Sequence, residues 1–166
     1  VNYMHMIDHG RSHIEKTYKR PIFQRLFRSL LSFVLPNPKI FKVLAWAVNI
    51  VRPLSFMFPE FIKNSMKLMP ANLPKKTLKE QKVYPVDKDK QVARVALLTG
   101  CVQREISPEI NESTIRLLNR HNVEVIVLPE INCCGSLDHH MGKDKSAHTL
   151  FKKNINLWYD EYLNNG

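Results

Sequence analysis

The chain has 166 residues, of which 44% are hydrophobic and 24% are charged, which is enough length and apolar content for an ordinary buried core. This composition excludes a disordered chain, and the lack of a secretory-type opening favours an intracellular, reducing compartment. The formal charge of +10 is uneven, because residues 1–91 carry 17 Lys and Arg against 6 Asp and Glu, whereas residues 92–166 carry 8 against 9. Any anionic partner is therefore expected to contact the first half.

Residues 1–69 are expected to form a helical module in short pieces separated by prolines. Pro21 opens a helix with an apolar stripe, and Pro36 and Pro38 end it. A further apolar segment, Ile40 to Val51, is expected to stop at Arg52-Pro53, short of the ~20 residues that a bilayer-spanning helix needs. We expect these stripes to pack against another domain, with a membrane-surface role as the alternative.

Three histidines in the first helix recur every four residues, namely His5, His9 and His13. On a helix they line one edge about 6 Å apart, a spacing that can chelate a metal ion. Only Asp8 offers a further ligand nearby. A solvent-facing or partner-facing stripe is the favoured interpretation.

Residues 70–91 are predicted to be an extended linker, because they contain three prolines and many lysines without apolar periodicity. Residues 92–166 then have an α/β rhythm. Val92 to Thr99 and Val123 to Leu128 are predicted strands joined by a helix that Ser107 caps, which indicates a right-handed parallel β-α-β unit. A last helix, about residues 144–163, is expected to pack on the sheet through Ala147, Phe151, Ile155, Trp158 and Tyr162, with Asn165-Gly166 as its C-cap. The predicted fold class is α/β: an N-terminal helical segment, then a partial parallel β-α-β cysteine-rich domain with a C-terminal helix.

All three cysteines, Cys101, Cys133 and Cys134, lie within one stretch of 34 residues. Adjacent cysteines point in different directions, so core packing does not explain the pair, and a thiolate site does. Both predicted strands end at the same edge of a parallel sheet, which brings the cysteines together there. Gly100 and Gly135 would let the backbone approach an inorganic group closely and donate N–H groups to its sulfides.

These residues resemble the "CCG" cysteine-rich domain of the glycolate oxidase iron-sulfur subunit family, a domain also found in heterodisulfide reductase and lactate-utilisation proteins. The resemblance covers nearly the whole chain, because the helical module resembles the segment that follows the family's paired ferredoxin-type clusters. The segments that carry it are Gly100-Cys101-Val102-Gln103, Pro108-Glu109-Ile110-Asn111, Cys133-Cys134-Gly135-Ser136-Leu137, His139-His140-Met141-Gly142, Asn154-Ile155, Asp8-His9-Gly10-Arg11 and Arg20-Pro21.

The resemblance implies an electron-transfer subunit that carries electrons from a flavin-bearing partner, which oxidises glycolate or a related 2-hydroxy acid, toward a membrane quinone. It implies that Cys101, Cys133 and Cys134 ligate a metal or iron-sulfur centre, with a 4Fe-4S cluster in the full subunit. The family's CxxCxxCxxxCP runs are absent, and its further cysteine would fall just past Gly166. The chain therefore looks like an interior piece of a longer subunit, a component of an oxidoreductase complex that is not catalytic alone.

Several alternatives stay open at this point. Three thiolates need a fourth donor from His139, His140, water or a partner. A zinc or dithiol site is the main alternative to an iron-sulfur cluster, and three reduced, structurally incidental thiols are the other. The two histidines either orient the centre from outside or lie at the surface in a polar loop. Arg104 and Lys143 are interpreted as solvated surface, or as groups that steer an anionic partner.

Two further expectations concern partners and place. An interaction fragment that binds a partner or a membrane surface through its basic helices is the remaining non-redox hypothesis, and no nucleic-acid partner is expected because the sequence shows no recognisable binding module. No hydrolytic or phosphate-binding motif is visible, so we expect no catalytic residues. The expected location is cytoplasmic, or peripheral on the inner face of the plasma membrane.

Overall fold

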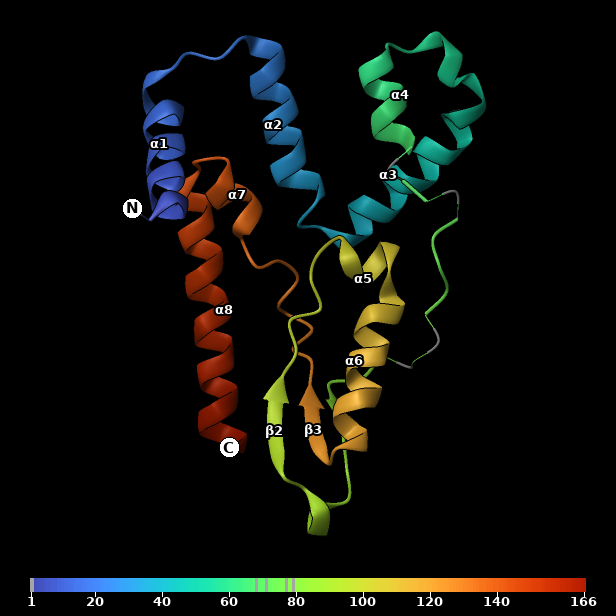
Figure 1. Cartoon of the computed structure of the whole chain (residues 1–166), viewed down its shortest axis with the longest axis vertical. Helices are drawn as coiled ribbons and strands as arrows, with labels where there is room; N and C mark the ends of the chain where they lie inside the picture. Colours follow the sequence, from blue (N-terminus) through green and yellow to red (C-terminus); the bar gives the residue numbers. More distant parts are fainter. Residues whose placement is uncertain (1, 68, 71, 77, 79) are drawn as a thin grey trace.

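The structure is a computed structural model that describes residues 2–67, 69–70, 72–76, 78 and 80–166, except for the side chain of residue 61. A small sheet lies at one end of the molecule, between a helix on either side (Figure 1). The helices of residues 3–67 lie at the other end, toward which the two parallel strands point (Figure 1). The fold therefore directs the carboxyl ends of these strands at the helical module.

The first half is helical, as predicted. Its elements are α1 (Tyr3–Thr17), α2 (Ile22–Val34), α3 (Pro38–Val51), the 3-10 helix η1 (Arg52–Met57) and α4 (Glu60–Lys67). Pro21 is the N-cap of α2 and Pro38 opens α3, since the fixed φ of proline suits the start of a helix and its missing N–H is not needed there.

The third α-helix ends at Val51, as the predicted boundary at Arg52-Pro53 requires, but the helical winding does not stop there. Pro53 lies in the first turn of η1, so the chain keeps winding as a 3-10 helix to Met57, because a proline in a first turn removes no helical hydrogen bond. The combined segment Pro38–Met57 has 20 residues and a mean hydropathy of 1.4, so by length and composition alone it could cross a membrane. Only 11% of its apolar window is buried, so it is not the core helix of the described structure.

The second half contains the predicted β-α-β unit. Its elements are β1 (Val83–Tyr84), the 3-10 helix η2 (Lys88–Lys90), β2 (Ala93–Ala96), α5 (Gln103–Ile106), α6 (Pro108–Arg120), β3 (Val123–Ile126), α7 (Ser136–His140) and α8 (Asp144–Asn165). Strands β2 and β3 are parallel, with Val95 opposite Val125, which confirms the predicted pairing. The sheet order is β1-β3-β2, and β1 pairs antiparallel with β3.

Strand β1 lies inside the stretch that was predicted to be a linker. It is two residues long and Pro85 follows it, so it leaves no alternating pattern in the sequence. The core forms where this strand meets the β-α-β unit, around Tyr84, Ile115 and the fully buried Val125. Part of residues 70–91 is therefore built into the domain.

The buried face of α8 differs from the prediction. Ala147 is buried as predicted, and Phe151 and Trp158 are half-buried. Ile155 and Tyr162 are exposed, however, and Asn154 and Glu161, seven and fourteen residues after Ala147, are buried instead. Two hydrogen bonds explain this difference. The Asn154 amide donates to the Cys133 carbonyl at 2.8 Å, and Arg94 of β2 donates to Glu161 at 2.8 Å. Hydrogen-bond partners on the facing loop and strand, and not apolar contacts alone, set the rotation of this helix.

Candidate metal and thiol centre

The thiols of Cys101 and Cys133 meet at the carboxyl edge of the parallel strands. Cys101 follows β2, and Cys133 lies in the loop between β3 and α7. The Cys133 S–H donates a hydrogen bond to the Cys101 sulfur, which lowers the pKa of Cys101 to about 7 and, together with burial, raises the pKa of Cys133. The pair therefore holds one readily lost proton, and Cys101 is the thiolate.

Backbone amides of the loop point at the sulfur atoms. The Gly135 N–H lies 3.4 Å from the Cys133 Sγ, and the Ser136 N–H lies 3.5 Å from the Cys134 Sγ. Gly135 has a φ of +87°, and a Cβ there would lie 2.9 Å from the Phe151 ring. Only glycine fits this turn, and the turn aims the amides at the thiols.

The third cysteine is placed differently. The Cys134 S–H lies 3.2 Å from the hydroxyl oxygen of Ser136, although it is near enough to affect Cys101 electrostatically. Among the residues that the structure describes, no three Cys, His, Asp or Glu side chains converge on a metal position. Thiol donors with backbone N–H groups suit an iron-sulfur or zinc centre, but the described geometry supplies two converged ligands, with Cys134 adjacent and no fourth.

The two histidines after the cysteine pair lie in the short helix α7, not in a loop. His139 Nε2 lies 3.4 Å from Asp8 Oδ2, and His140 Nδ1 lies 3.3 Å from Asp8 Oδ1. Desolvation opposes ionisation of Asp8, but the hydrogen bond with His140 and the charges of both histidines lower its pKa. These imidazoles thus attach α1 to α7, and their role toward the metal centre stays a prediction.

The histidine stripe of α1 is exposed, in keeping with the solvent-facing interpretation, and it borders a hollow. His5, His9 and His13 line a hollow of about 430 Å³ together with His139 and His148. These side chains do not form a three-ligand metal site in the part of the chain that the structure describes. The stripe therefore lies at the surface, along the edge of the hollow between α1 and the α7–α8 corner.

Arg104 and Lys143, interpreted from sequence as solvated surface or as steering groups, both make specific contacts. Arg104 Nε lies 3.4 Å from the buried carboxylate of Glu105. Lys143 donates to the Arg28 carbonyl at 3.3 Å and to the Ser32 hydroxyl at 2.7 Å. The solvated interpretation was wrong, because each cation finds oxygen atoms that come from distant parts of the chain or from a buried group.

Two polar residues near the thiols were not singled out as site residues from sequence. The side-chain amide of Asn154 donates to the carbonyl of Cys133. The sequence feature that could have indicated this residue is its position seven residues after Ala147, on the buried face of a helix. Asp138 is 4% exposed; its Oδ2 accepts from Ser146, while its Oδ1 has no hydrogen-bond partner among the described residues. It also raises the pKa of Cys133, after larger effects of Cys101 and burial. No periodicity in the sequence indicated that Asp138 would be buried.

The fold, with its cysteines at the carboxyl edge of the parallel strands, agrees with a known domain family. Residues 95–163 match the family model of the CCG cysteine-rich domain, so the resemblance predicted from the cysteine motifs is confirmed for this part of the chain.

The chain is similar to named iron-sulfur proteins along most of its length. It is 31% identical to the glycolate oxidase iron-sulfur subunit of Escherichia coli over 96% of this chain and 36% of that protein. It is 26% identical to the probable glycolate oxidase iron-sulfur subunit of Bacillus subtilis over 60% of this chain and 22% of that protein. The chain thus spans about a third of the length of the first relative and less of the second. No solved structure matches significantly.

Proposed function

We propose that this chain is part of an iron-sulfur electron-transfer subunit of a glycolate (2-hydroxy-acid) oxidase complex, which passes electrons from a flavin subunit toward a quinone. The observation that carries the proposal is the hydrogen-bonded pair Cys101 and Cys133, which two parallel strands bring together inside the CCG match. The relatives named as iron-sulfur subunits support the same assignment.

The proposed cofactor is an iron-sulfur cluster, of the 4Fe-4S type in the complete subunit. Cys101 and Cys133 would bind it, Cys134 would join after its thiol turns from Ser136, and the N–H of Gly135 would donate to sulfur. Such a cluster supplies one-electron redox chemistry when bound. A fourth ligand is required from another part of the subunit, a partner or water. Zinc is the second candidate, because a thiolate set also suits it.

Anaerobic reconstitution with iron and sulfide tests this proposal. We expect a brown protein with iron and acid-labile sulfide, and an electron paramagnetic resonance signal on reduction. Cys101→Ser and Cys133→Ser should each abolish the colour, while Ser113→Ala, an exposed serine on α6, should leave it unchanged. A colourless protein that retains one zinc would favour the zinc site, and circular dichroism of each variant would show that the fold is kept.

We further propose a cytoplasmic location with attachment to the inner face of the membrane. The segment Pro38–Met57 supports the attachment because it is apolar and mostly exposed, with Trp46, Ile50 and Phe56 among its exposed side chains. The basic residues of the first half would add electrostatic attraction to anionic lipid. A flavin-bearing subunit that covers this surface is the competing partner.

A further inference from the structure

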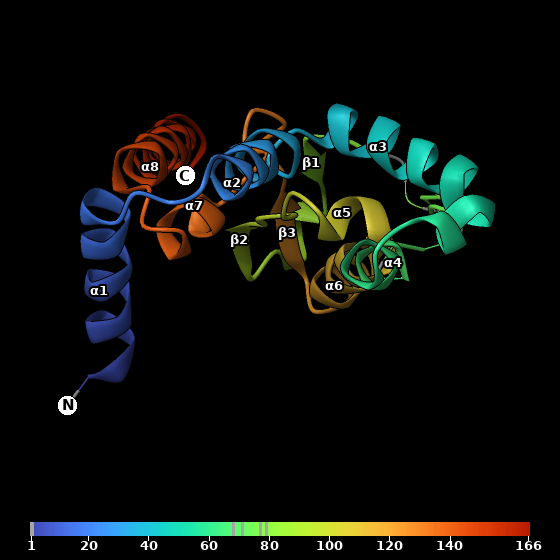
Figure 2. The same ribbon diagram turned by 90° about the horizontal axis from the view of Figure 1, so that it is seen from above.

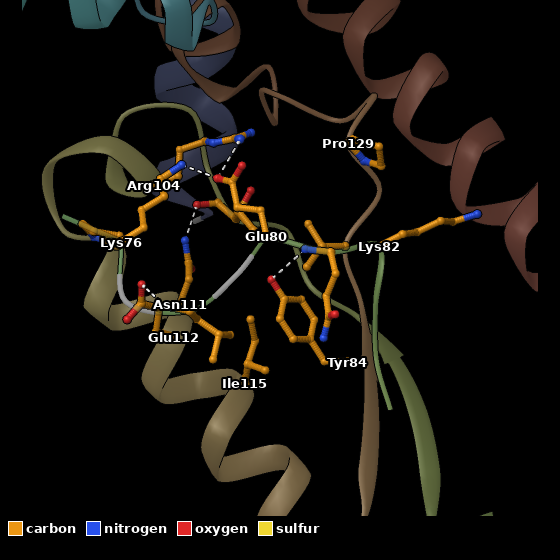
Figure 3. Close-up of a pocket in the computed structure, with 14 residues that line it drawn as sticks. Lys76, Glu80, Lys82, Tyr84, Arg104, Asn111, Glu112, Ile115 and Pro129 are labelled. Carbon is orange, nitrogen blue, oxygen red and sulfur yellow. Dashed lines mark hydrogen bonds and ion pairs between the residues drawn. The ribbon is translucent and has the colours of Figure 1, made fainter. Parts of the chain in front are cut away.

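A cavity of about 260 Å³ lies beside the sheet (Figure 3), and no cysteine is among its lining residues. Its apolar wall comes from Leu78, Tyr84, Ile115 and Val127, which belong to or pack against the core cluster. This volume is near the lower end of small-molecule sites. The wall suits a small ligand with an apolar body.

The opposite side of the cavity is charged. Lys76 and Arg104 both lie at the carboxylate of Glu80, with Arg104 Nη2 3.7 Å from Glu80 Oε1 (Figure 3). The hydrogen bond from Lys76 outweighs desolvation and lowers the pKa of Glu80. A carboxylate thus already occupies the position between these two cations.

The Glu80 carboxylate can leave at low cost, whereas its neighbour Glu105 cannot. The Glu80 side chain is 63% exposed, so water can solvate it once it swings out, and an exposed ion pair contributes little. The Glu105 side chain is 2% exposed and is held by Lys42, Lys76 and Arg104. Without Glu80, the three cations Lys42, Lys76 and Arg104 would face Glu105. Glu112, the other carboxylate of the lining, accepts from the Leu78 N–H and pairs with Arg116, so the group that replaces Glu80 should be an anion.

We propose that this cavity binds a small amphipathic carboxylate, whose apolar body lies against Leu78, Tyr84 and Ile115 and whose carboxylate replaces Glu80 between Lys76 and Arg104. The site uses none of the cysteines, so it does not rest on the proposed iron-sulfur function.

The same arginine links the cavity to the thiol loop. Arg104 Nη1 donates to Asn132 Oδ1 at 3.3 Å, and Asn132 precedes Cys133. Thr99, at the rim of the cavity, lies two residues before Cys101. A ligand whose carboxylate replaces Glu80 at Arg104 is therefore expected to change the environment of the thiols of Cys101 and Cys133.

Titration of the full chain with 4-phenylbutyrate and with its uncharged amide tests the proposal by nuclear magnetic resonance. The backbone amides of Leu78 and Gln81 are the reporters, because they donate to Glu112 at 3.1 Å and to the Tyr84 hydroxyl at 3.4 Å beside the cavity. The acid should shift both signals and should bind about tenfold more tightly than the amide, since a charge-assisted contact is worth about one decade in affinity.

Three variants define the charged end. Glu80→Gln should tighten binding of the acid several-fold, because it removes the internal competitor, and Lys76→Met should weaken it about tenfold. Lys75→Met is the matched control, since Lys75 is exposed on the same segment and does not line the cavity. Equal binding of acid and amide, no effect of Glu80→Gln, or shifts confined to the exposed faces of α2 and α3 would each overturn the proposal.

Discussion

The low pKa of Cys101 comes mainly from its hydrogen bond with Cys133, with smaller contributions from the backbone N–H groups of Val102 and Cys101. With a pKa lowered to about 7, below that of an ordinary thiol, Cys101 loses its proton as the pH rises through neutrality, and only the thiolate reacts quickly with alkylating reagents. In the metal-free protein we expect the rate of iodoacetamide labelling at Cys101 to reach half its maximum near pH 7.

The matched variant is Cys133→Ala, which removes the S–H donor. The labelling midpoint of Cys101 should then move upward, toward the ordinary pKa of a thiol, because its thiolate loses the stabilising hydrogen bond. Mass spectrometry of tryptic peptides over a range of pH values measures both midpoints. An unchanged midpoint in Cys133→Ala would show that the two thiols are not paired.

Two glycines of this chain should respond to alanine in opposite ways. Gly142 has a φ of +76°, and a Cβ there would lie 2.5 Å from the Arg11 carbonyl oxygen of α1, whereas a Cβ at Gly10 meets nothing within 4 Å. Gly142→Ala should therefore destabilise the fold by about 1–3 kcal/mol and loosen α1. Gly10→Ala should stabilise it by about 0.5–1 kcal/mol, since Gly10 lies inside a helix.

Urea unfolding of both variants gives these free energies, and hydrogen exchange of the α1 amides separates local detachment from global loss. If Gly142→Ala left the α1 exchange rates unchanged, then α1 would not pack against the turn between α7 and α8.

At the scale of elements, Arg94 of β2 binds carboxylates on two other elements, β3 and α8. Arg94 Nε donates to Glu124 of β3 at 2.7 Å, and Arg94 Nη2 donates to Glu161 of α8 at 2.8 Å. Both carboxylates are largely buried, so a lost partner would leave charge without compensation. The buried polar stripe of α8 thus ends on an ionic contact with the sheet.

Arg94→Met should lower the free energy of unfolding by about 3 kcal/mol, with Arg120→Met at an exposed position on α6 as the control. The hydrogen bond from Lys82, and then that from Arg94, lowers the pKa of Glu161. Its contribution to stability is therefore present above the unfolded pKa and is lost as the pH falls through the lowered folded value. Urea unfolding at neutral and acidic pH should show a smaller effect of Arg94→Met in acid, and an equal loss at both would contradict this pairing.

At the scale of the whole molecule, charge and apolar exposure coincide in one half. Figure 2 shows α1 and α3 extending beyond the sheet and its flanking helices. Large apolar side chains of α2, α3 and η1 are exposed there, and the same residue range carries the excess of Lys and Arg. This combination is typical of surfaces that bind a membrane or a partner.

The proposed attachment predicts binding to vesicles that contain phosphatidylglycerol and weaker binding to pure phosphatidylcholine. The fluorescence of Trp46, which is 66% exposed, should shift to the blue on binding, and high salt should reverse part of the binding. Ile50→Asp on the same face should abolish the shift, whereas Leu163→Asp, at an exposed position on α8, should not. No shift with either vesicle would leave a protein partner as the occupant of this surface.

Local patterns in the sequence determined the helices, their proline boundaries, the parallel β-α-β unit and the cysteine motif that identified the domain. Each depends on neighbours along the chain: a period of 3.6 residues, a fixed proline φ, or a glycine beside a cysteine. That is why α2, α6 and α8 were predicted close to their observed bounds, whereas β1, only two residues long, was not.

Only the tertiary structure decided which distant side chains meet. The tertiary structure places the thiol of Cys101 against that of Cys133, whereas the thiol of Cys134 points to Ser136. It also places His139 and His140 next to Asp8. The rotation of α8 buries Asn154 and Glu161. The tertiary structure also added a 3-10 helix, Arg52–Met57, directly after the third α-helix. These outcomes depend on hydrogen bonds and packing between segments far apart in the chain, and periodicity carries no information about the partner on the other side of a contact.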